Sequence, residues 1–257
     1  MTLIQHIENG VCTLTLNRPE VFNSFNKEMA MALQSALDAA EKNEEIRAIV
    51  ITGTGKAFCA GQDLAEAMDP NGPELQSIVK DHYNPIIMRI RNIEKPIIAA
   101  VNGVAAGAGA NIALACDLTF AKNSASFIQA FSKIGLIPDS GGTFFLPRLI
   151  GSQKALALMM TGEKISAQQA DAMNMIYRAV EDENFDTEVQ KMATTLAAMP
   201  TKGLGLTKKA VNESFTNSLE QQLAVEEKLQ TEAGQTYDFN EGVNAFLEKR
   251  APVFKGK

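Results

Sequence analysis

The sequence predicts an α/β protein with an amino-terminal core of strands and helices and a helical carboxyl-terminal part. Short apolar runs rich in Val and Ile alternate with helical patterns up to about residue 150, and such alternation is typical of a sheet built from βα units. From about residue 152, amphipathic helical patterns follow one another. A chain of 257 residues with 46% hydrophobic and 21% charged residues can also bury a full core.

The first elements are a hairpin, a helix and a strand. Residues 3–17 hold two alternating or β-branched runs on either side of Asn9-Gly10, which is a hairpin signal. The run IRAIVITG at 46–53 is short, apolar and β-branched, so we expect a buried strand in a sheet covered on both faces. Between them, residues 24–43 place five apolar residues on one helical face: Met29, Leu33, Ala36, Leu37 and Ala40.

The same alternation recurs further along the chain. Residues 66–80 carry Pro, Gly and charge, and we interpret them as a mobile surface loop that leads into a helix. Ser166 is a candidate helix N-cap. We expect strands at 95–103 and 118–123, and helices at 108–116, 152–175, 187–199, 202–215 and 219–234.

The composition disfavours several classes of function. A net charge of −6 and a pI of about 5.1 argue against a general nucleic-acid surface, because phosphate binding needs clustered cations. The amino terminus has no basic start followed by an apolar run, so we expect no signal peptide. The apolar run at 96–116 is broken by Asn and Gly, which is typical of a core rather than a membrane span. Three widely spaced cysteines and two histidines predict reduced thiols, a cytoplasmic location and no metal site.

Two glycine-rich segments follow predicted strands. In GTGKAFCAGQDL at 53–64 the glycines permit close approach to a ligand, although a plain strand–helix turn would look the same. In NGVAAGAGANIALA at 102–115 small residues leave the start of a helix uncovered. Its free N–H groups could face an anion, or the small residues could serve close helix packing. Neither segment matches a phosphate loop or a dinucleotide fingerprint.

A third candidate is Asp139, within FSKIGLIPDSGGTFFLPRLIG at 131–151. Pro-Asp-Ser-Gly is ordinary turn chemistry. A carboxylate near a largely apolar pocket instead has its charged form disfavoured, which makes it a better base. The local sequence leaves both interpretations open.

An ordered set of motifs along nearly the whole chain resembles the enoyl-CoA hydratase/isomerase (crotonase) superfamily. The motifs are NRPEVFNSFN, GKAFCAGQDL, KPIIAAVNGVAAGAG, ACDLTFAKNSASF, GLIPDSGGTFFLPRLIG, MTGEKISAQQA and EGVNAFLEKRAPVFKGK. The resemblance implies a crotonase-like spiral of ββα units over 1–195 and an all-helical trimerisation region over 196–257. It also implies an acyl-CoA substrate and no cofactor, since coenzyme A enters as part of the substrate. The expected assembly is a homotrimer or a dimer of trimers, with a complex with a paralogous hydratase as a further option.

The resemblance also implies roles for individual residues. By motif position, the backbone N–H groups of Gln62 and Ala108 hold the thioester oxygen as charge develops on it. The two glutamates of the hydratases correspond to Asn111 and Phe131, which cannot transfer a proton as Glu does. The acid of the superfamily's isomerases corresponds to Asp139.

The substrate-binding set also follows from the resemblance. Phe254 and Lys257 are expected to reach a neighbouring subunit, and a solvated surface charge is the alternative for each Lys or Arg. Asp63 is expected to hold its own loop more than to bind ligand. The residues expected to bind the substrate or its CoA are Arg18, Lys56, Ala60, Gln62, Asp63, Leu64, Asn111, Phe131, Phe254 and Lys257.

Within the superfamily, AGAGA, GLIPD and the terminal FLEKRAPVFKGK are most similar to isomerases that convert ring-epoxyphenylacetyl-CoA to oxepin-CoA. We expect this reaction and/or 3-enoyl to 2-enoyl-CoA isomerisation, with Asp139 as the base. The superfamily's dehalogenases pair an Asp with His and Trp, and this chain has no Trp. The alternatives are an enoyl-CoA hydratase of fatty-acid or aromatic degradation, a non-catalytic CoA-binding paralogue, and an RNA-binding paralogue that the net charge disfavours. The residues expected to keep water from the base are Leu136, Ile137, Phe144 and Phe131.

Overall fold

Two sheets form the amino-terminal part of the protein. The computed structural model describes residues 1–257. The larger sheet has six strands: β1 (Leu3–Glu8), β2 (Val11–Leu16), β3 (Ala48–Gly53), β5 (Ile97–Val101), β7 (Leu118–Lys122) and β10 (Arg178–Val180), in that spatial order. The smaller sheet has four: β4 (Ala57–Cys59), β6 (Val104–Ala106), β8 (Ser126–Ile128) and β9 (Lys164–Ser166).

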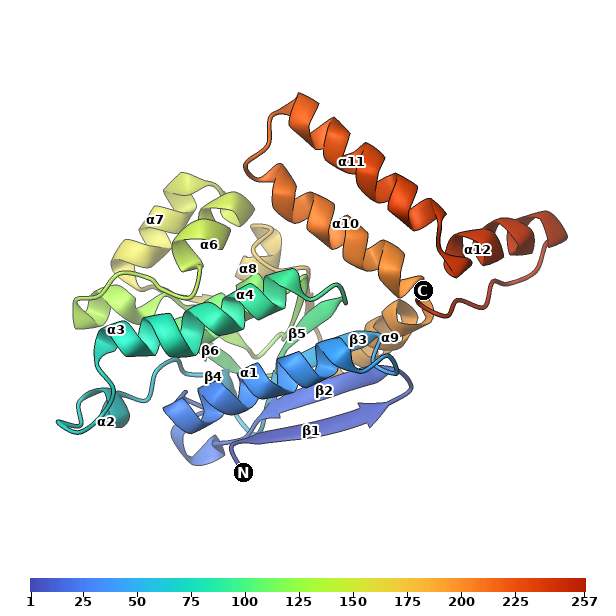
Figure 1. The fold of residues 1–257 in the computed structure, drawn as a ribbon. Coiled ribbons are helices and arrows are strands. Elements are labelled where there is room, and N and C mark those ends of the chain that lie inside the picture. The colour runs from blue at the N-terminus through green and yellow to red at the C-terminus, as the bar shows by residue number, and fades with distance from the viewer.

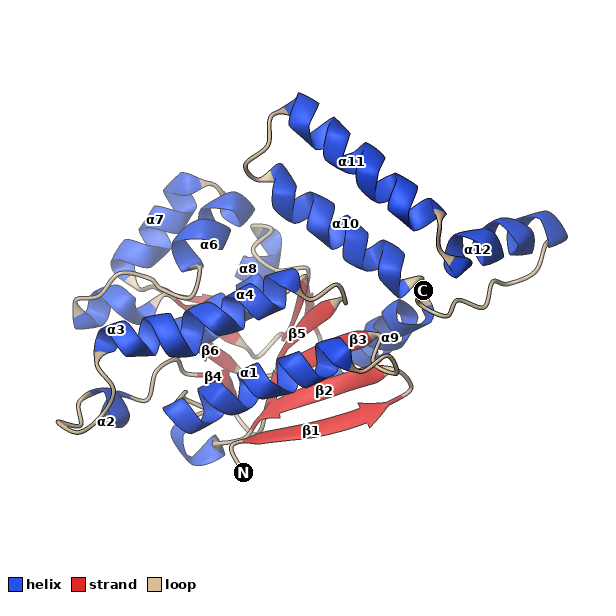
Figure 2. Ribbon diagram, in the orientation of Figure 1, coloured by secondary structure: helices blue, strands red, loops and turns tan.

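Successive strands alternate between the two sheets. The strands β3, β5 and β7 lie in the larger sheet, and each is followed directly by β4, β6 or β8 in the smaller one. Neighbours among these strands are parallel, and helices complete the crossovers that parallel pairing requires. Figure 2 shows helices lying across one side of the strands. The predicted spiral of ββα units is confirmed.

Helical segments connect the strands and continue after the last strand. The shorter segments are η1 (Pro19–Val21), α2 (Leu64–Ala67), α3 (Leu75–Ser77), the π-helix η2 (Ile78–Tyr83) and η3 (Ala130–Ile134). The longer helices are α1 (Lys27–Lys42), α4 (Asn84–Asn92), α5 (Ala108–Ala115), α6 (Gly142–Ile150), α7 (Ser152–Thr161), α8 (Ala167–Ala172), α9 (Phe185–Ala198), α10 (Thr201–Ser214), α11 (Leu219–Gly234) and α12 (Tyr237–Glu248). The segment 66–80 was expected to be a loop leading into a helix. It begins with the end of α2, and the helical path resumes at Leu75.

The hairpin and the first helix agree with the prediction. Asn9 and Gly10 have φ of 50° and 76°, and positive φ at both turn residues is the type I′ geometry that suits a hairpin. The strands β1 and β2 are antiparallel. All five residues of the predicted apolar face are buried in α1.

The buried strand β3 has a hydrophobic core on each face. Ile49 and Ile51 belong to the main core, which includes the buried face of α1. Ala48 and Val50 belong to a second core, formed with α9. The expectation of a sheet covered on both faces is therefore confirmed.

The chain after residue 152 is not purely helical, contrary to the prediction. Strand β9 extends the smaller sheet antiparallel to β8, and β10 extends the larger sheet parallel to β7. Each has only three residues, too few to show a strand period, and each buries one apolar side chain, Ile165 or Val180. Ser166 caps α8 as predicted, in a reciprocal capping box with Gln169.

The last three helices, α10 to α12, extend away from the sheets (Figure 1). Helix α11 packs on α10 and buries only Leu229. The domain boundary drawn between residues 195 and 196 falls inside α9, which packs against the larger sheet, and the division into two regions stays a prediction. None of the helices combines the length and apolarity needed to cross a bilayer.

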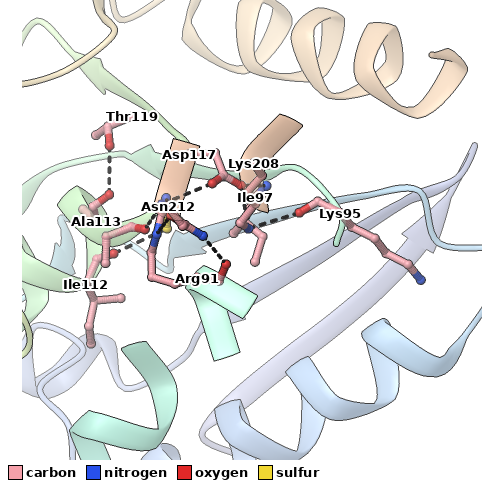
Figure 3. Close-up of polar contacts among 11 residues, drawn as sticks. Arg91, Lys95, Ile97, Ile112, Ala113, Asp117, Thr119, Lys208 and Asn212 are labelled. Atoms are coloured by element: carbon pink, nitrogen blue, oxygen red, sulfur yellow. Dashed lines mark hydrogen bonds and ion pairs between the residues drawn. The ribbon is translucent and has the colours of Figure 1, made fainter. Parts of the chain in front are cut away.

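A partly buried ion cluster joins α10 to the core (Figure 3). Lys208 of α10 places its Nζ 2.8 Å from Asp117 Oδ2, and Arg91 of α4 donates to Asp117 Oδ1 at 3.2 Å. The Ile97 N–H at the start of β5 also donates to Asp117, and Asn212 of α10 accepts from Arg91. The Lys208 side chain is only 8% exposed. One carboxylate thus holds helices from distant parts of the chain.

Candidate active site

The two predicted glycine-rich turns meet in the structure. A Cβ built on Gly61, whose φ is +94°, would lie 3.0 Å from Ala106 O and 3.5 Å from Ala108 N. A Cβ on Gly109 would lie 2.4 Å from Cys59 O. The missing side chains therefore let the start of α5 lie directly against β4 and the turn that follows it. The close-packing interpretation of these glycines is confirmed, whereas their approach to a ligand stays a prediction.

The two proposed oxyanion donors lie on these touching segments. Ala108 is the first residue of α5, so its N–H has no acceptor within the helix and sits at the positive end of the helix dipole. Gln62 forms an isolated parallel bridge with Phe25. The bridge uses Phe25 N–H to Gly61 O and Asp63 N–H to Phe25 O, at 2.7 and 2.8 Å. The Gln62 N–H lies outside that pair and is free for a ligand oxygen.

Asp139 lies on the turn before α6. Its backbone carbonyl accepts from Gly142 N–H at 2.9 Å, and Ser140 and Gly141 both have positive φ, so the residue does form a tight turn. Burial raises the pKa of the Asp139 carboxyl, and the Ser140 hydroxyl, which donates to its Oδ1 at 2.9 Å, partly opposes that rise. The carboxylate has no cationic partner in the structure. Such a group is a better base than an exposed Asp.

Asn111 of α5 holds the Asp139 turn. Its Nδ2 donates to the Asp139 carbonyl at 2.8 Å, and its Oδ1 accepts from Gln129 Nε2 at 2.8 Å. A Cβ on Gly142 would lie 2.3 Å from Asn111 Nδ2, so the glycine makes room for this contact. The buried Asn111 amide is therefore committed to the Asp139 turn.

Sequence reasoning did not identify Gln129 as a site residue. Gln129 is buried, and its Oε1 has no hydrogen-bond partner. Phe131, the other position that corresponds to a hydratase glutamate, is also buried. A Cβ on Gly107 would lie 3.8 Å from its ring.

Three of the four residues expected to cover Asp139 are themselves open to solvent, and their cover of the carboxylate stays a prediction. Leu136, Ile137 and Phe144 are 38%, 80% and 37% exposed. The Phe144 ring packs edge-on against the rings of Phe145 and Phe215. Of the four predicted residues, only Phe131 is buried.

Several of the residues expected to bind CoA lie on or near the first turn. Arg18 donates to Asp63 Oδ2 at 2.9 Å and to Ser24 O at 2.7 Å. Asp63 also caps α2 through the Ala65 N–H, so it holds its own loop as expected. Lys56 is exposed. Ala60 donates its N–H to Phe22 O, and Leu64 is 53% exposed at the start of α2. Their contacts with CoA stay predictions.

Within one chain, the carboxyl-terminal tail lies away from the two glycine-rich turns. The Phe254 carbonyl accepts from Arg47, just before β3, while the glycine-rich turn begins at the other end of that strand. The Lys257 carbonyl accepts from the N–H of Asp238 in α12. Neither residue contacts the turns within its own chain, so their assignment to a neighbouring subunit's site stays a prediction.

Comparison with known proteins identifies this arrangement. Residues 6–257 match the enoyl-CoA hydratase/isomerase family. The chain is 49% identical to 1,2-epoxyphenylacetyl-CoA isomerase of Escherichia coli over 99% of this chain and 98% of that protein. It is 45% identical to a Rhodobacter capsulatus protein named "Probable enoyl-CoA hydratase", over 100% and 98% of the two chains. The crystal structure of an enoyl-CoA hydratase from Polaromonas superposes with a TM-score of 0.91 at 38% identity, covering 98% of this chain and 99% of that one. With its motifs, its spiral of ββα units and its paired turns all in place, the chain belongs to the enoyl-CoA hydratase/isomerase family.

Proposed function

We propose that this protein is an acyl-CoA isomerase that works with one carboxylate base and a two-donor oxyanion site. The observation that carries the proposal is the contrast between the partners of the Asp139 carboxylate and those of the other acids, Asp63 and Glu66. Asp63 is paired with Arg18, and Glu66 accepts from the Lys27 N–H and the Gln62 amide. The side-chain carboxylate of Asp139 accepts only from the Ser140 hydroxyl, and burial raises the pKa of this carboxyl.

The reaction uses these groups in sequence. The thioester oxygen binds the N–H groups of Gln62 and Ala108, which stabilise the negative charge that forms when a C2 proton leaves. The Asp139 carboxylate takes that proton and becomes a carboxylic acid. The C2–H electron pair moves into the conjugated enolate, the double bond shifts, and Asp139 returns the same proton to C4 or the equivalent ring position. No atom is gained or lost, and the base is regenerated.

Hydration would require a second group to activate water. The two positions at which the hydratases carry glutamate hold Asn111 and Phe131 here, and Asn111 is already committed to the Asp139 carbonyl. Neither side chain can exchange a proton with water as Glu does. Isomerisation is therefore favoured over hydration.

The substrate class follows from the relatives and from the single base. The Escherichia coli relative is named for 1,2-epoxyphenylacetyl-CoA. Ring expansion of the epoxide breaks the carbon–carbon bond that it shares with the six-membered ring, and that electron pair moves into the ring double bonds. The methylene then lies between the thioester and an unsaturated ring, and it offers the same acidic C2 proton as a 3-enoyl chain. We propose ring-epoxyphenylacetyl-CoA, converted to oxepin-CoA, and 3-enoyl-CoA as the substrates.

The test is a side-by-side assay of the purified protein. Ring-epoxyphenylacetyl-CoA, a 3-enoyl-CoA and crotonyl-CoA are compared at equal enzyme concentration. We expect turnover of one or both isomerisation substrates and slow hydration of crotonyl-CoA. Hydration at or above the isomerisation rate would make the protein a hydratase. Tight CoA-ester binding with no turnover of any substrate would make it a non-catalytic paralogue.

A further inference from the structure

A buried phenol lies beside the oxyanion turn, and the proposed reaction gives it no role. Tyr83 is 1% exposed and is the last residue of the π-helix η2. Segments of π-helix are rare and are frequently found at functional sites. The Tyr83 hydroxyl donates to Gln62 Oε1 at 2.8 Å, and its ring meets the Phe25 ring edge-on, with centroids 5.7 Å apart. Phe25 is also the residue that bridges to Gln62 through the backbone.

The Gln62 side chain is held at both ends of its amide. Its Nε2 donates to Glu66 Oε2 at 3.1 Å and to the Asp63 carbonyl at 3.3 Å. Glu66 in turn accepts from the Lys27 N–H at the start of α1, at 3.0 Å. An ionised carboxylate only accepts, so the amide nitrogen must face Glu66 and the amide oxygen must face the phenol. The phenol therefore donates to the amide, and the amide donates to the carboxylate, so the hydrogen bonds all run from Tyr83 towards Glu66.

The phenol keeps its proton in this environment. Burial raises the pKa of Tyr83 well above its usual value, and nearby acidic groups, Asp139 among them, raise it further. Tyr83 is thus a permanent donor at neutral pH rather than an acid or base of the reaction. Its hydroxyl acts through the group to which it donates, which is the Gln62 side chain.

We infer that Tyr83 is a positioning residue for the oxyanion donor at Gln62, whose side chain it fixes so that the Gln62 N–H stays aimed at the thioester oxygen. The inference rests on the proposed function. The preceding residue, Gly61, has no side chain and adopts a φ of +94°, so it places little restraint on the next peptide. An oxyanion donor lowers the barrier only if it is oriented before charge develops. The backbone bridge to Phe25 supplies one restraint, and the Tyr83–Gln62–Glu66 chain supplies another.

The experiment compares three variants with the wild type. Tyr83→Phe removes only the hydroxyl, Gln62→Met removes its acceptor while keeping the backbone N–H, and the double variant combines them. Tyr177→Phe is the matched control, since Tyr177 is 44% exposed and packs edge-on against Phe120. One readout is kcat and KM with a 3-enoyl-CoA. The other is the dissociation constant and ultraviolet red shift of bound cinnamoyl-CoA, a chromophoric thioester whose spectrum reports carbonyl polarisation.

We expect Tyr83→Phe to lower kcat roughly 10-fold, less than the 10²–10³-fold typical of losing an oxyanion donor outright. Cinnamoyl-CoA should bind within a few-fold of the wild type but with a smaller red shift. Gln62→Met should behave in the same way. The double variant should be no worse than either single variant, because the two groups act as one unit.

Each other outcome overturns a specific statement. If Tyr83→Phe matches Tyr177→Phe in kcat and red shift, or if the two single effects simply multiply, the positioning role is wrong. If Tyr83→Phe does not fold, Gln62→Met alone tests the positioning role, because it leaves the phenol in place. Wild-type kcat and red shift in Gln62→Met would then show that the role is wrong. A wild type that neither shifts the cinnamoyl-CoA spectrum nor isomerises any substrate would overturn the proposed function, and this inference with it.

Discussion

Replacing Asp139 with Asn is the most direct perturbation of the proposed chemistry. The amide is nearly the size of the carboxylate but cannot accept the C2 proton. The turn that carries it is held through the backbone carbonyl, by Asn111 Nδ2 and by Gly142 N–H, and the substitution touches neither bond. The oxyanion donors lie on other segments and also stay in place. The variant therefore separates proton transfer from binding.

The expected magnitude follows from what is lost and what remains. Losing a general base typically costs about 10²–10⁴ in rate, which corresponds to a barrier increase of about 3–5 kcal/mol. The dissociation constant of a CoA ester should stay within a few-fold, because the thioester oxygen keeps its donors. Burial raises the pKa of the Asp139 carboxyl, so the acid limb of wild-type kcat/KM should lie above the ordinary Asp value of 3.8. The residual activity of Asp139→Asn should lack that limb.

Steady-state kinetics of the isomerase across pH, with ligand titration, tests this reasoning. Asp186→Asn is the matched control, an exposed acid in the first turn of α9 that should leave both kcat and the pH profile unchanged. Near-normal turnover of Asp139→Asn would mean that another residue is the base. An unaltered acid limb in the variant would mean that the limb belongs to a different group.

Three further outcomes follow from the same structure. Between the pKa of Asp139 in the unfolded chain and its raised pKa in the folded protein, the folded protein keeps a proton that the unfolded chain has lost. Stability therefore falls as the pH rises through this interval. Asp139→Asn should raise the melting temperature at pH 7 and change it less near pH 4. Asp117→Asn leaves Lys208, whose side chain is 8% exposed, without its anion. It should lower the free energy of unfolding, measured by chemical denaturation, by about 3–5 kcal/mol. For comparison, Asp38→Asn breaks an ion pair at the surface and should lower the same free energy by at most about 1 kcal/mol. Helices α11 and α12 expose large apolar side chains, with Phe246 83% exposed, so light scattering should report a trimer or a dimer of trimers, and a monomer at micromolar concentration would contradict this.

Local signals in the sequence predicted most of the framework. Asn9-Gly10 fixes its own turn, the apolar face of α1 repeats at helical spacing, and β3 is a continuous β-branched run. The glycine-rich turns and Asp139 were identified from motifs that are short, contiguous stretches of sequence. Each of these features depends on a few consecutive positions, which is why sequence reasoning reaches them.

The features that the sequence did not reveal depend on distant partners. Tyr83 contacts Gln62 across 21 positions, and Gln129 contacts Asn111 across 18. No local pattern marks either pair, because an isolated Tyr or Gln looks the same in a core and in a site. The exposure of Ile137 was not predicted, for the related reason that an apolar residue carries no sign of which neighbours cover it.

One position on α5 decides how the Asp139 turn is held, and this gives the last prediction. Asn111 donates to the Asp139 carbonyl, whereas an ionised carboxylate at this position can only accept. A hydratase-like acid at 111 and this geometry of the Asp139 turn are therefore incompatible. Asn111→Asp keeps the bond from Gln129 and loses only the donor to Asp139, so one buried acceptor faces another.

The Asp139 carbonyl keeps its bond from the Gly142 N–H, but the new carboxylate oxygen at 111 is a buried acceptor without a donor. Leaving a buried acceptor unpaired costs about 1–3 kcal/mol, and the Asn111→Asp protein should unfold more easily by roughly that amount. Its kcat should also fall, because the base loses one of the two hydrogen bonds that hold its turn. Protonating the new carboxyl restores a donor at 111, so the stability defect should shrink as the pH is lowered. Denaturation at several pH values, alongside isomerase kinetics, measures both effects. A variant as stable and as active as the wild type at neutral pH would show that the Asp139 turn does not depend on Asn111.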